Sequence, residues 1–328
     1  MNSAAPIPTS KPATRAGHGR MHFLMFLVIF CWSSNIIAGK EALKGFAPLA
    51  LAQLRVLGAA VIYAICFLVS GRMRRLPLSR RKWIFLMAMA ATGVAINQLT
   101  FIGGMARSTV AHTGLIIALG PVMVLVIAVV IRLEALTAWK FAGMMIAFAG
   151  VGVLTADKAG QGTAGHWVGD LILLASTLVF AIYIILVKEV ANSFDALTLN
   201  TLTFVLGAIM MFPFCAREVA VTNWAAVRPV AWWGLAFIIV FGSVISYLLF
   251  AYVMTELAAS RAAAFNYLQP VIASGLGIWI LSERLTSKVL IGGALILAGV
   301  YLTERERGDE GNPGNSIAPV DGAGIAPK

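Results

Sequence analysis

Apolar residues gather in ten long stretches along the chain, separated by short segments that hold most of the charged residues. The stretches cover residues 21–43, 48–70, 83–105, 108–131, 137–155, 168–190, 197–215, 231–254, 258–281 and 287–303. A helix needs about 17 to 25 mainly apolar residues to cross a bilayer, because lipid offers no partner to free backbone groups. The pattern therefore predicts an all-α, polytopic membrane protein with ten transmembrane helices.

The stretches follow a repeat, because residues 83–154 match the residues 149 positions later without a gap. Gly93 falls on Gly242, and Pro121 falls on Pro270. The period is too long for a solenoid of short repeats, so we expect two homologous halves of five helices each. Because five is odd, the second half enters the membrane from the opposite side, which predicts an inverted repeat.

This repeat divides the chain into five segments. We predict a disordered cytoplasmic tail at 1–20, a first repeat at 21–155, a linker at 156–167, a second repeat at 168–303 and another disordered cytoplasmic tail at 304–328. The tails are poor in apolar residues, and such segments cannot bury enough apolar surface to fold.

The composition agrees with a membrane location. Hydrophobic residues make up 60% of the chain and charged residues 12%, whereas a soluble domain carries roughly 25% charged residues. The three cysteines are scattered through apolar stretches, so neither a disulfide framework nor a metal site is indicated. We expect no cofactor and no metal.

Positive charge sets the expected orientation. The densest basic cluster, at residues 72–82, lies on the same predicted side as the basic N-terminal tail, and this side holds about twice as many Lys and Arg residues as the other. This places both termini in the cytoplasm of a multi-pass protein of the cell (inner) membrane. The net charge of +11 would suggest nucleic-acid binding in a soluble protein. Here we expect no nucleic-acid partner, because basic loops beside a membrane fix orientation or contact anionic lipid.

Polar and aromatic residues in the middle of apolar stretches mark the candidate substrate site, since polar groups are costly at membrane depth and tend to face a cavity. Asn97-Gln98 and Ser246-Tyr247 occupy matching positions in the two halves. The alternative is that such groups only join neighbouring helices by hydrogen bonds. The substrate-binding candidates from this pattern are Trp32, Asn35, Asn97, Gln98, Tyr183, Ser246 and Tyr247.

Proline interrupts two apolar stretches at matching positions, Pro121 and Pro270. Each proline removes a backbone donor, which predicts a kink. Broken helices often line transporter sites, so we expect Asn266 and Gln269, beside the second kink, to contact the substrate. The alternative is a kink that only shapes helix packing.

Three cationic or ionisable residues lie within or near the apolar stretches. Arg55 lies about 10 Å into its helix, and we expect it to brace the structure through carbonyl acceptors. His112 and Arg261 occupy matching positions on opposite sides of the membrane, where each would guard one mouth of a cavity. The alternative for His112 is a hydrogen-bonded packing residue.

Small residues form a stripe on the fifth and tenth predicted helices. Gly143 and Gly150 share one face, and Gly292 and Gly299 share the corresponding face. Small residues let helices approach closely. The stripe fits packing within one chain or a homo-oligomer through these two helices.

These residues resemble the EamA family of the drug/metabolite transporter superfamily over nearly the whole helical region. The matching pieces are Trp32-Ser33-Ser34-Asn35, Leu54-Arg55, the segment from Ser108 to Thr137 with its Gly-Pro-Val, and its counterpart from Ala259 to Thr286 with Gln-Pro-Val. The resemblance implies two EamA repeats around a central cavity, the fifth and tenth helices set apart, and export of small metabolites such as amino acids. Two departures are Ser33, where the family often has Gly, and a sixth helix without the Trp-rich form.

The predicted function is secondary transport of a small molecule, such as an amino acid or a related compound, by alternating access. The fourteen acidic residues lie near helix ends, loops or tails, which predicts a facilitator-like exporter, with proton coupling through His112 as the alternative. A nucleotide-sugar or sugar-phosphate carrier would need several cavity cations. An integral-membrane lipid-modifying enzyme would need a nucleophile with a base, paired carboxylates or metal ligands, and the sequence shows no such motif.

Overall fold

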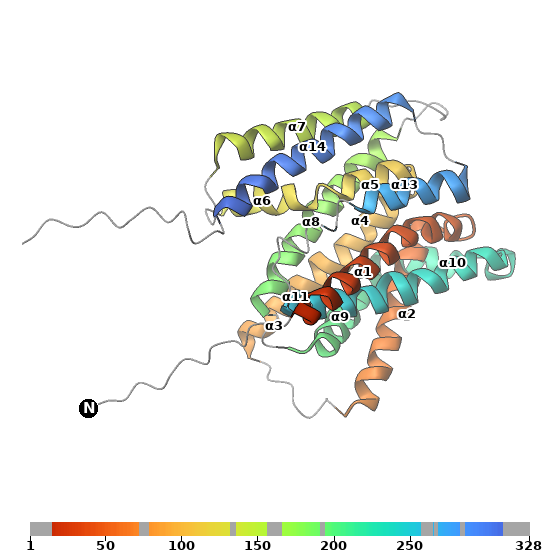
Figure 1. Cartoon of the computed structure of the whole chain (residues 1–328). Helices are drawn as coiled ribbons and strands as arrows, with labels where there is room; N and C mark the ends of the chain where they lie inside the picture. Colours follow the sequence, from red (N-terminus) through yellow and green to blue (C-terminus); the bar gives the residue numbers. More distant parts are fainter. Residues whose placement is uncertain are drawn as a thin grey trace, which may run out of the picture.

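The computed structural model describes residues 15–71, 79–131, 136–155, 166–190, 194–256, 265, 268–282 and 286–310. Within these ranges all regular structure is helical, as the predicted all-α class requires (Figure 1). The elements are α1 (Arg15–Ala42), α2 (Pro48–Val69), α3 (Arg80–Met89), the π-helical η2 (Ala90–Ala95), α4 (Ile96–Met105), α5 (Val110–Ile117), α6 (Gly120–Val130), α7 (Ala138–Thr155), α8 (Trp167–Val190), α9 (Ala196–Val221), the 3-10 helix η3 (Trp224–Ala226), α10 (Pro229–Ile239), the π-helical η4 (Val240–Ile245), α11 (Ser246–Glu256), α13 (Leu268–Leu281) and α14 (Ser287–Glu310).

Seven helical segments of the described residues are long and apolar enough to cross a membrane. They are Arg20–Ala42, Pro48–Val69, Arg80–Met105, Val110–Ile127, Trp167–Val187, Ala196–Val221 and Pro229–Met254. Three shorter apolar helices, in α7, α13 and α14, fall on the fifth, ninth and tenth predicted stretches. Ten crossings therefore stay a prediction.

Several helices extend beyond the predicted apolar stretches. α1 begins at Arg15, α9 continues to Val221 and α14 continues to Glu310. Charged residues such as Arg and Glu are good helix formers, so backbone hydrogen bonds continue where the apolar residues stop. Part of each predicted disordered tail is thus helical. The rest of the tails, and most of the predicted linker at 156–167, lies outside the described residues.

Large apolar side chains cover much of the outer surface. Trp233 is 77% exposed and Trp279 is 81% exposed. An apolar surface of this kind is costly in water, whereas lipid tails solvate it readily. The exposed surface therefore agrees with the hydropathy of the helices.

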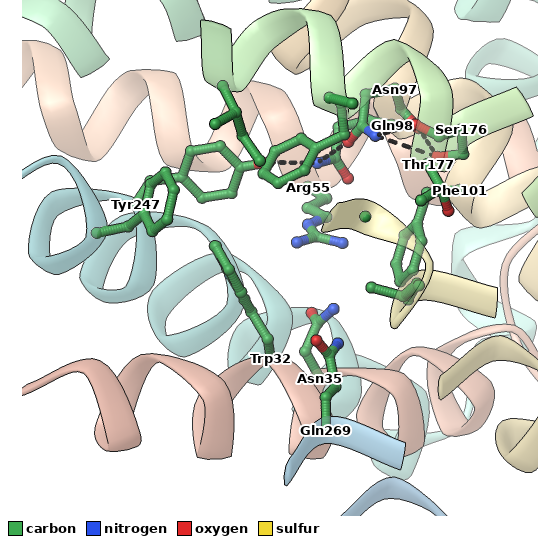
Figure 2. Close-up of a pocket in the computed structure, with 16 residues that line it drawn as sticks. Trp32, Asn35, Arg55, Asn97, Gln98, Phe101, Ser176, Thr177, Tyr247 and Gln269 are labelled. Carbon is green, nitrogen blue, oxygen red and sulfur yellow. Dashed lines mark hydrogen bonds between the residues drawn. The ribbon is translucent and has the colours of Figure 1, made fainter. Parts of the chain in front are cut away.

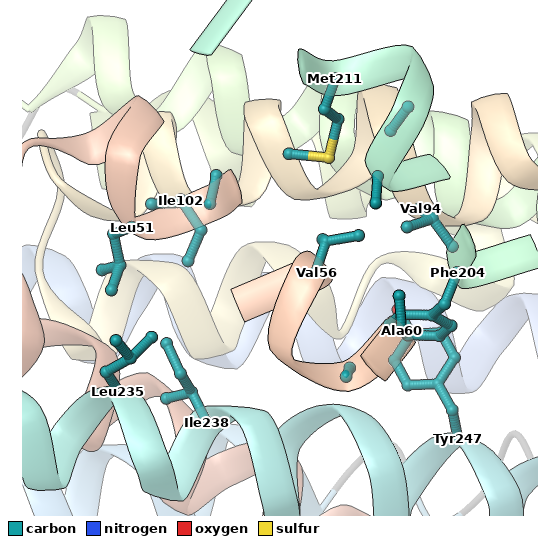
Figure 3. Packing of buried hydrophobic residues seen from close by; sticks show 14 of the residues in the cluster. Leu51, Val56, Ala60, Val94, Ile102, Phe204, Met211, Leu235, Ile238 and Tyr247 are labelled. Atoms are coloured by element: carbon teal, nitrogen blue, oxygen red, sulfur yellow. The ribbon is translucent and has the colours of Figure 1, made fainter. Parts of the chain in front are cut away.

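The core joins elements from both halves of the chain. Val56 and Ala60 of α2 belong to one buried cluster with Val94 of η2, Phe204 of α9 and Ile238 of α10 (Figure 3). Burial of such side chains contributes roughly 1.5–3 kcal/mol each relative to exposure in water, and in lipid close packing takes over this role. The shared core fixes how the helices around the cavity are placed.

Two π-helical segments interrupt long helices at corresponding places in the two halves. η2 joins α3 to α4, and η4 joins α10 to α11. A Cβ on Gly93 would lie 2.1 Å from the Tyr183 ring, and a Cβ on Gly242 would lie 2.2 Å from Asn35 Oδ1. Glycine therefore lets Tyr183 and Asn35 approach the backbone of these segments.

The fourth predicted stretch is broken at its centre. α5 ends at Ile117, and α6 begins at Gly120 with Pro121 in its first turn. A proline in a first turn removes a donor that has no partner there. The interruption lies beside Pro121, where the kink was predicted, and the apolar helical segment Val110–Ile127 runs across it. Pro270 lies in α13, whose described part begins at Leu268.

α7 and α14 pack against each other along their glycine stripes, at the edge of the molecule (Figure 1). A Cβ on Gly150 would lie 2.7 Å from the Gly292 carbonyl oxygen, and a Cβ on Gly299 would lie 2.5 Å from the Gly143 carbonyl oxygen. The glycines thus serve packing within the chain. A homo-oligomer through α7 and α14 would have to use other faces, and it stays a prediction.

Candidate functional site

A cavity opens where α1, α2, α4, α8, α11, α13 and the α5–α6 break meet (Figure 2). The space between its lining side chains is about 770 Å³ when the open solvent at its mouth is included. Both halves of the chain supply its wall. The lining residues are Trp32, Asn35, Arg55, Asn97, Gln98, Phe101, Ile117, Gly120, Ser176, Thr177, Phe180, Ala181, Ile184, Tyr247, Phe250 and Gln269.

One part of the wall is aromatic. The ring centroid of Trp32 lies 6.0 Å from that of Phe180, 6.0 Å from that of Tyr247 and 5.3 Å from that of Phe250. Side chains from α1, α8 and α11 thus form one cluster. Such rings offer rigid apolar faces to the apolar part of a ligand.

A hydrogen-bonded polar group lies on another side of the cavity. Asn97 Nδ2 donates to the Ser176 hydroxyl oxygen at 3.1 Å and to the Ser176 carbonyl at 3.2 Å. Gln98 Nε2 donates to the Tyr247 hydroxyl at 3.2 Å and to Asn97 Oδ1 at 3.3 Å. These bonds connect α4 with α8 and α11, so Gln98 and Tyr247, which were predicted to occupy matching positions in the two halves, are in direct contact. Gln98 Oε1 is buried without a partner among the described residues.

Arg55 projects from α2 into the cavity and is 2% exposed (Figure 2). Its Nε donates to the Ser243 hydroxyl at 2.9 Å, and one terminal nitrogen donates to the Gly242 carbonyl at 3.1 Å. Its guanidinium carbon lies 5.8 Å from the centroid of the Phe101 ring. The expected bracing through a carbonyl is thus present, but the same side chain also lines the cavity.

Two amides also line the cavity, together with Arg55. Asn35 of α1 and Gln269 of α13 point towards the guanidinium in Figure 2. Asn35 Oδ1 and Gln269 Oε1 are buried, and neither has a hydrogen-bond partner among the described residues. The cavity therefore contains acceptor oxygens without hydrogen bonds. It also contains a cation, Arg55, that forms no ion pair with a carboxylate of the described residues.

The structure brings together six of the predicted substrate-binding residues: Trp32, Asn35, Asn97, Gln98, Tyr247 and Gln269. Tyr183 lies behind the lining, with its ring centroid 5.4 Å from that of Phe180. Ser246 is buried and donates to the carbonyl of Phe241 within its own helix. Asn266 and Arg261 lie outside the described residues.

Several lining residues escaped the sequence analysis. Ser176 and Thr177 form a polar pair in the middle of the apolar α8, which is the same signal that identified Asn97 and Gln98. Apolar lining residues such as Phe101 have no such signal, because an aromatic residue in an apolar helix also suits lipid or core.

His112 does not belong to the described cavity lining. It is 1% exposed, and its Nδ1 lies 2.9 Å from Asp170 Oδ2, at hydrogen-bond distance. Ser108 Oγ donates to Asp170 Oδ1, and Lys40 Nζ donates to the Ser108 carbonyl. We call Ser108, His112 and Asp170 the helix-end cluster. The position of His112 matches the alternative of a hydrogen-bonded packing residue, and guarding a cavity mouth stays a prediction.

Comparison of the sequence with known proteins shows similarity to one family. The EamA-like transporter family matches the chain twice, at residues 19–156 and 167–305. A protein of Archaeoglobus fulgidus named "Uncharacterized transporter" is 25% identical over 284 residues, which cover 87% of this chain and 98% of that protein. A protein of Streptantibioticus cattleyicolor named "Probable terminal-alkyne amino-acid exporter" is 26% identical over 289 residues, which cover 86% of this chain and 92% of that protein.

A solved structure, described only as "Crystal structure of protein", shares the fold. It superposes with a TM-score of 0.60 at 17% sequence identity over 90% of this chain and 99% of that chain. The helical arrangement is therefore one already observed by experiment. Since the two family matches together span most of the sequence, the chain belongs to the EamA-like transporter family.

Proposed function

We propose that the protein is a secondary transporter that exports small metabolites, such as amino acids or related compounds, by alternating access. The observation that carries this proposal is the cavity between helices of both halves, with polar groups beside an aromatic cluster. Relatives named as transporters, one of them as an amino-acid exporter, support it.

The architecture proposed with this function has ten transmembrane helices in two inverted repeats, at 21–155 and 168–303, in the cell (inner) membrane. Two family matches and two corresponding π-helical segments support the repeat. With both termini cytoplasmic, the α1–α2 connection lies outside and the α2–α3 connection lies inside. In a cysteine-free background, we expect Lys44→Cys to be labelled from outside the cell and Gly71→Cys only after permeabilisation. The opposite labelling would reverse the orientation.

The described cavity lining disfavours the two other classes. Arg55 is the one cationic residue in that lining, whereas a sugar-phosphate or nucleotide-sugar carrier needs several cations for its phosphates. The same lining contains hydroxyl groups but no His, Cys, Asp or Glu to act as base or metal ligand. A transporter of compounds with small net charge fits this composition better.

The test is solute flux through the purified full-length protein in liposomes, with a pooled panel of labelled amino acids and related metabolites. We expect saturable uptake that Gln98→Ala reduces, because this change removes the link to Tyr247 in the cavity. Trp233→Phe on the exposed surface is the control, and we expect it to leave uptake unchanged. Folded protein that moves no solute of the panel would contradict the proposal.

A further inference from the structure

The guanidinium of Arg55 is a buried charge whose hydrogen bonds are incompletely formed. Arginine has five N–H donors, and the described residues accept from two of its nitrogens, through Ser243 and Gly242. The remaining terminal nitrogen, Nη1, is buried without a partner. No carboxylate of the described residues forms an ion pair with Arg55. Removing a cation from water costs several kcal/mol unless an anion or well-placed acceptors compensate.

The placement of Arg55 is fixed before any ligand arrives. Ser243 and Gly242 belong to η4, and the Tyr63 hydroxyl donates to the neighbouring carbonyl of Val244 at 2.7 Å. The π-helical segment thus supplies acceptors that hold one edge of the guanidinium, while Nη1 has no partner among the described residues. A preorganised donor of this kind loses little entropy when it binds an anion.

Two further unpaired atoms of the lining have the complementary chemistry. Asn35 Oδ1 and Gln269 Oε1 are hydrogen-bond acceptors without a partner among the described residues. Four of the seven buried unpaired side-chain atoms in the described part of the chain belong to lining residues: Asn35, Arg55, Gln98 and Gln269. Buried polar atoms normally find partners, so this concentration points to a ligand that supplies them.

We propose that Arg55 binds a free carboxylate of the transported compound, and that the amide oxygens of Asn35 and Gln269 accept hydrogen bonds from its ammonium group. This rests on the proposed transport function and deepens it. The aromatic cluster around Trp32 then receives the remaining apolar part of the compound. The site selects zwitterionic amino compounds over amines, amides and esters, which lack the carboxylate.

The wild-type protein tests this selection directly with matched probes. The probes are L-phenylalanine, L-phenylalaninamide, phenethylamine and 3-phenylpropionate, each as a competitor of the uptake of labelled amino acids into liposomes. We expect L-phenylalanine to compete at a concentration about tenfold or more below the amide and the amine, because a hydrogen bond to a charged group is lost with the carboxylate. Equal competition by the amide or the amine would overturn the role of Arg55.

Two variants separate binding from bracing. Arg55→Gln is expected to reduce uptake about tenfold or more and to remove the preference for L-phenylalanine over its amide. Ser243→Ala removes one acceptor of the brace and keeps the charge, so we expect it to retain the preference even where uptake falls. If Arg55→Gln does not fold, the competition series and Ser243→Ala still decide the matter.

A third variant tests the proposed contact with the ammonium group of the transported compound. Asn35→Leu is expected to bring 3-phenylpropionate closer to L-phenylalanine as a competitor, because one of the two acceptors for the amino group is gone. An unchanged ratio would overturn that half of the proposal. Wild-type uptake without carboxylate preference would leave the transporter standing without this site, whereas no uptake of any probe by folded protein would remove the proposed function itself.

Discussion

The helix-end cluster and the central cavity both bury polar side chains, but they differ in how completely their hydrogen bonds are formed. Both carboxylate oxygens of Asp170 are hydrogen-bonded, one to Ser108 and the other to His112. Arg55 and Gln269, in the cavity, each leave a buried polar atom without a partner among the described residues. Burial and polarity alone would not separate these regions.

The difference indicates what each region does. A hydrogen-bonded polar group stabilises the fold, whereas each buried unpaired group costs about 1–3 kcal/mol. A protein can retain such an unpaired group where a bound ligand supplies its hydrogen-bond partner. The helix-end cluster is therefore expected to govern stability, and the cavity to govern transport, so variants in the two regions should have opposite signatures.

The largest expected effect lies in the helix-end cluster. Asp170→Ala leaves His112 and Ser108 without their acceptor and should lower the free energy of unfolding by about 3 kcal/mol. Thermal unfolding of the purified protein in detergent measures the change as a lower Tm. Glu41→Ala is the control, because its carboxylate pairs with the exposed Lys44, and such surface pairs contribute about 0–1 kcal/mol. If both variants unfold at the parent's Tm, the cluster does not stabilise the fold.

In the cavity we expect the reverse, a loss of transport without a loss of stability. Gln269→Met replaces an unpaired amide by an apolar side chain of similar length, so we expect transport to fall about tenfold while Tm stays equal or rises. Liposome uptake and thermal unfolding are measured on the same preparation. Gln53→Met is the matched control outside the cavity: Gln53 also leaves a buried Oε1 unpaired, but its Nε2 donates to the Ala208 carbonyl at 3.2 Å, and this bond would be lost. There we expect a lower Tm and an unchanged transport rate per folded molecule.

Tyr247 both stabilises the fold and lines the cavity, so we expect its substitution to have smaller effects on both unfolding and uptake. Its hydroxyl accepts a hydrogen bond from Gln98 at the cavity wall. Tyr247→Phe should lower the free energy of unfolding by about 1 kcal/mol and reduce uptake about threefold. Tyr301→Phe, on the exposed surface of α14, is expected to change neither quantity. A loss of uptake as large as that of Gln269→Met would make the hydroxyl a principal ligand contact.

The smallest effect should come from a proton gradient. No described cavity-lining residue carries a carboxylate or imidazole, so we expect a pH difference across liposomes to change uptake less than about twofold. If protons drive uptake strongly and His112→Gln abolishes that drive in folded protein, the helix-end cluster takes part in the transport cycle. The helix-end cluster would then serve transport as well as stability, and the two regions would no longer differ in this respect.

Sequence patterns identified much of the cavity because it uses polar residues where apolar ones are expected. Trp32, Asn97 and Gln98 belong to that set, and the structure places all three in the wall. The pairing of His112 with Asp170 could not be predicted in the same way. Both residues lie near helix ends, where ionisable side chains usually meet water, and periodicity within a helix does not set the register between helices.

Helix ends show a related limit. Apolar periodicity ends the seventh stretch at residue 215, yet α9 continues to Val221. Glu218 in the additional turn accepts a hydrogen bond from the Leu49 backbone N–H at the start of α2, at 3.2 Å. This contact caps another helix, so the reason for the extension lies in a distant part of the chain. Arg55 was similarly expected to be a brace, because nothing within α2 shows that η4 satisfies only part of its donors.

The corresponding positions of η2 and η4 carry a consequence for the origin of the protein. A π-helical turn corresponds to one residue inserted into an α-helix, and independent insertions at equivalent sites of two segments would be a coincidence. The two segments lie within one residue of equivalent positions, and we infer that a single-copy ancestor of the two halves already carried the insertion. In both copies a glycine of this segment receives a side chain from the first helix of a repeat, Tyr183 at Gly93 and Asn35 at Gly242. The second segment also holds Arg55, so an inherited irregularity kept one role and gained another.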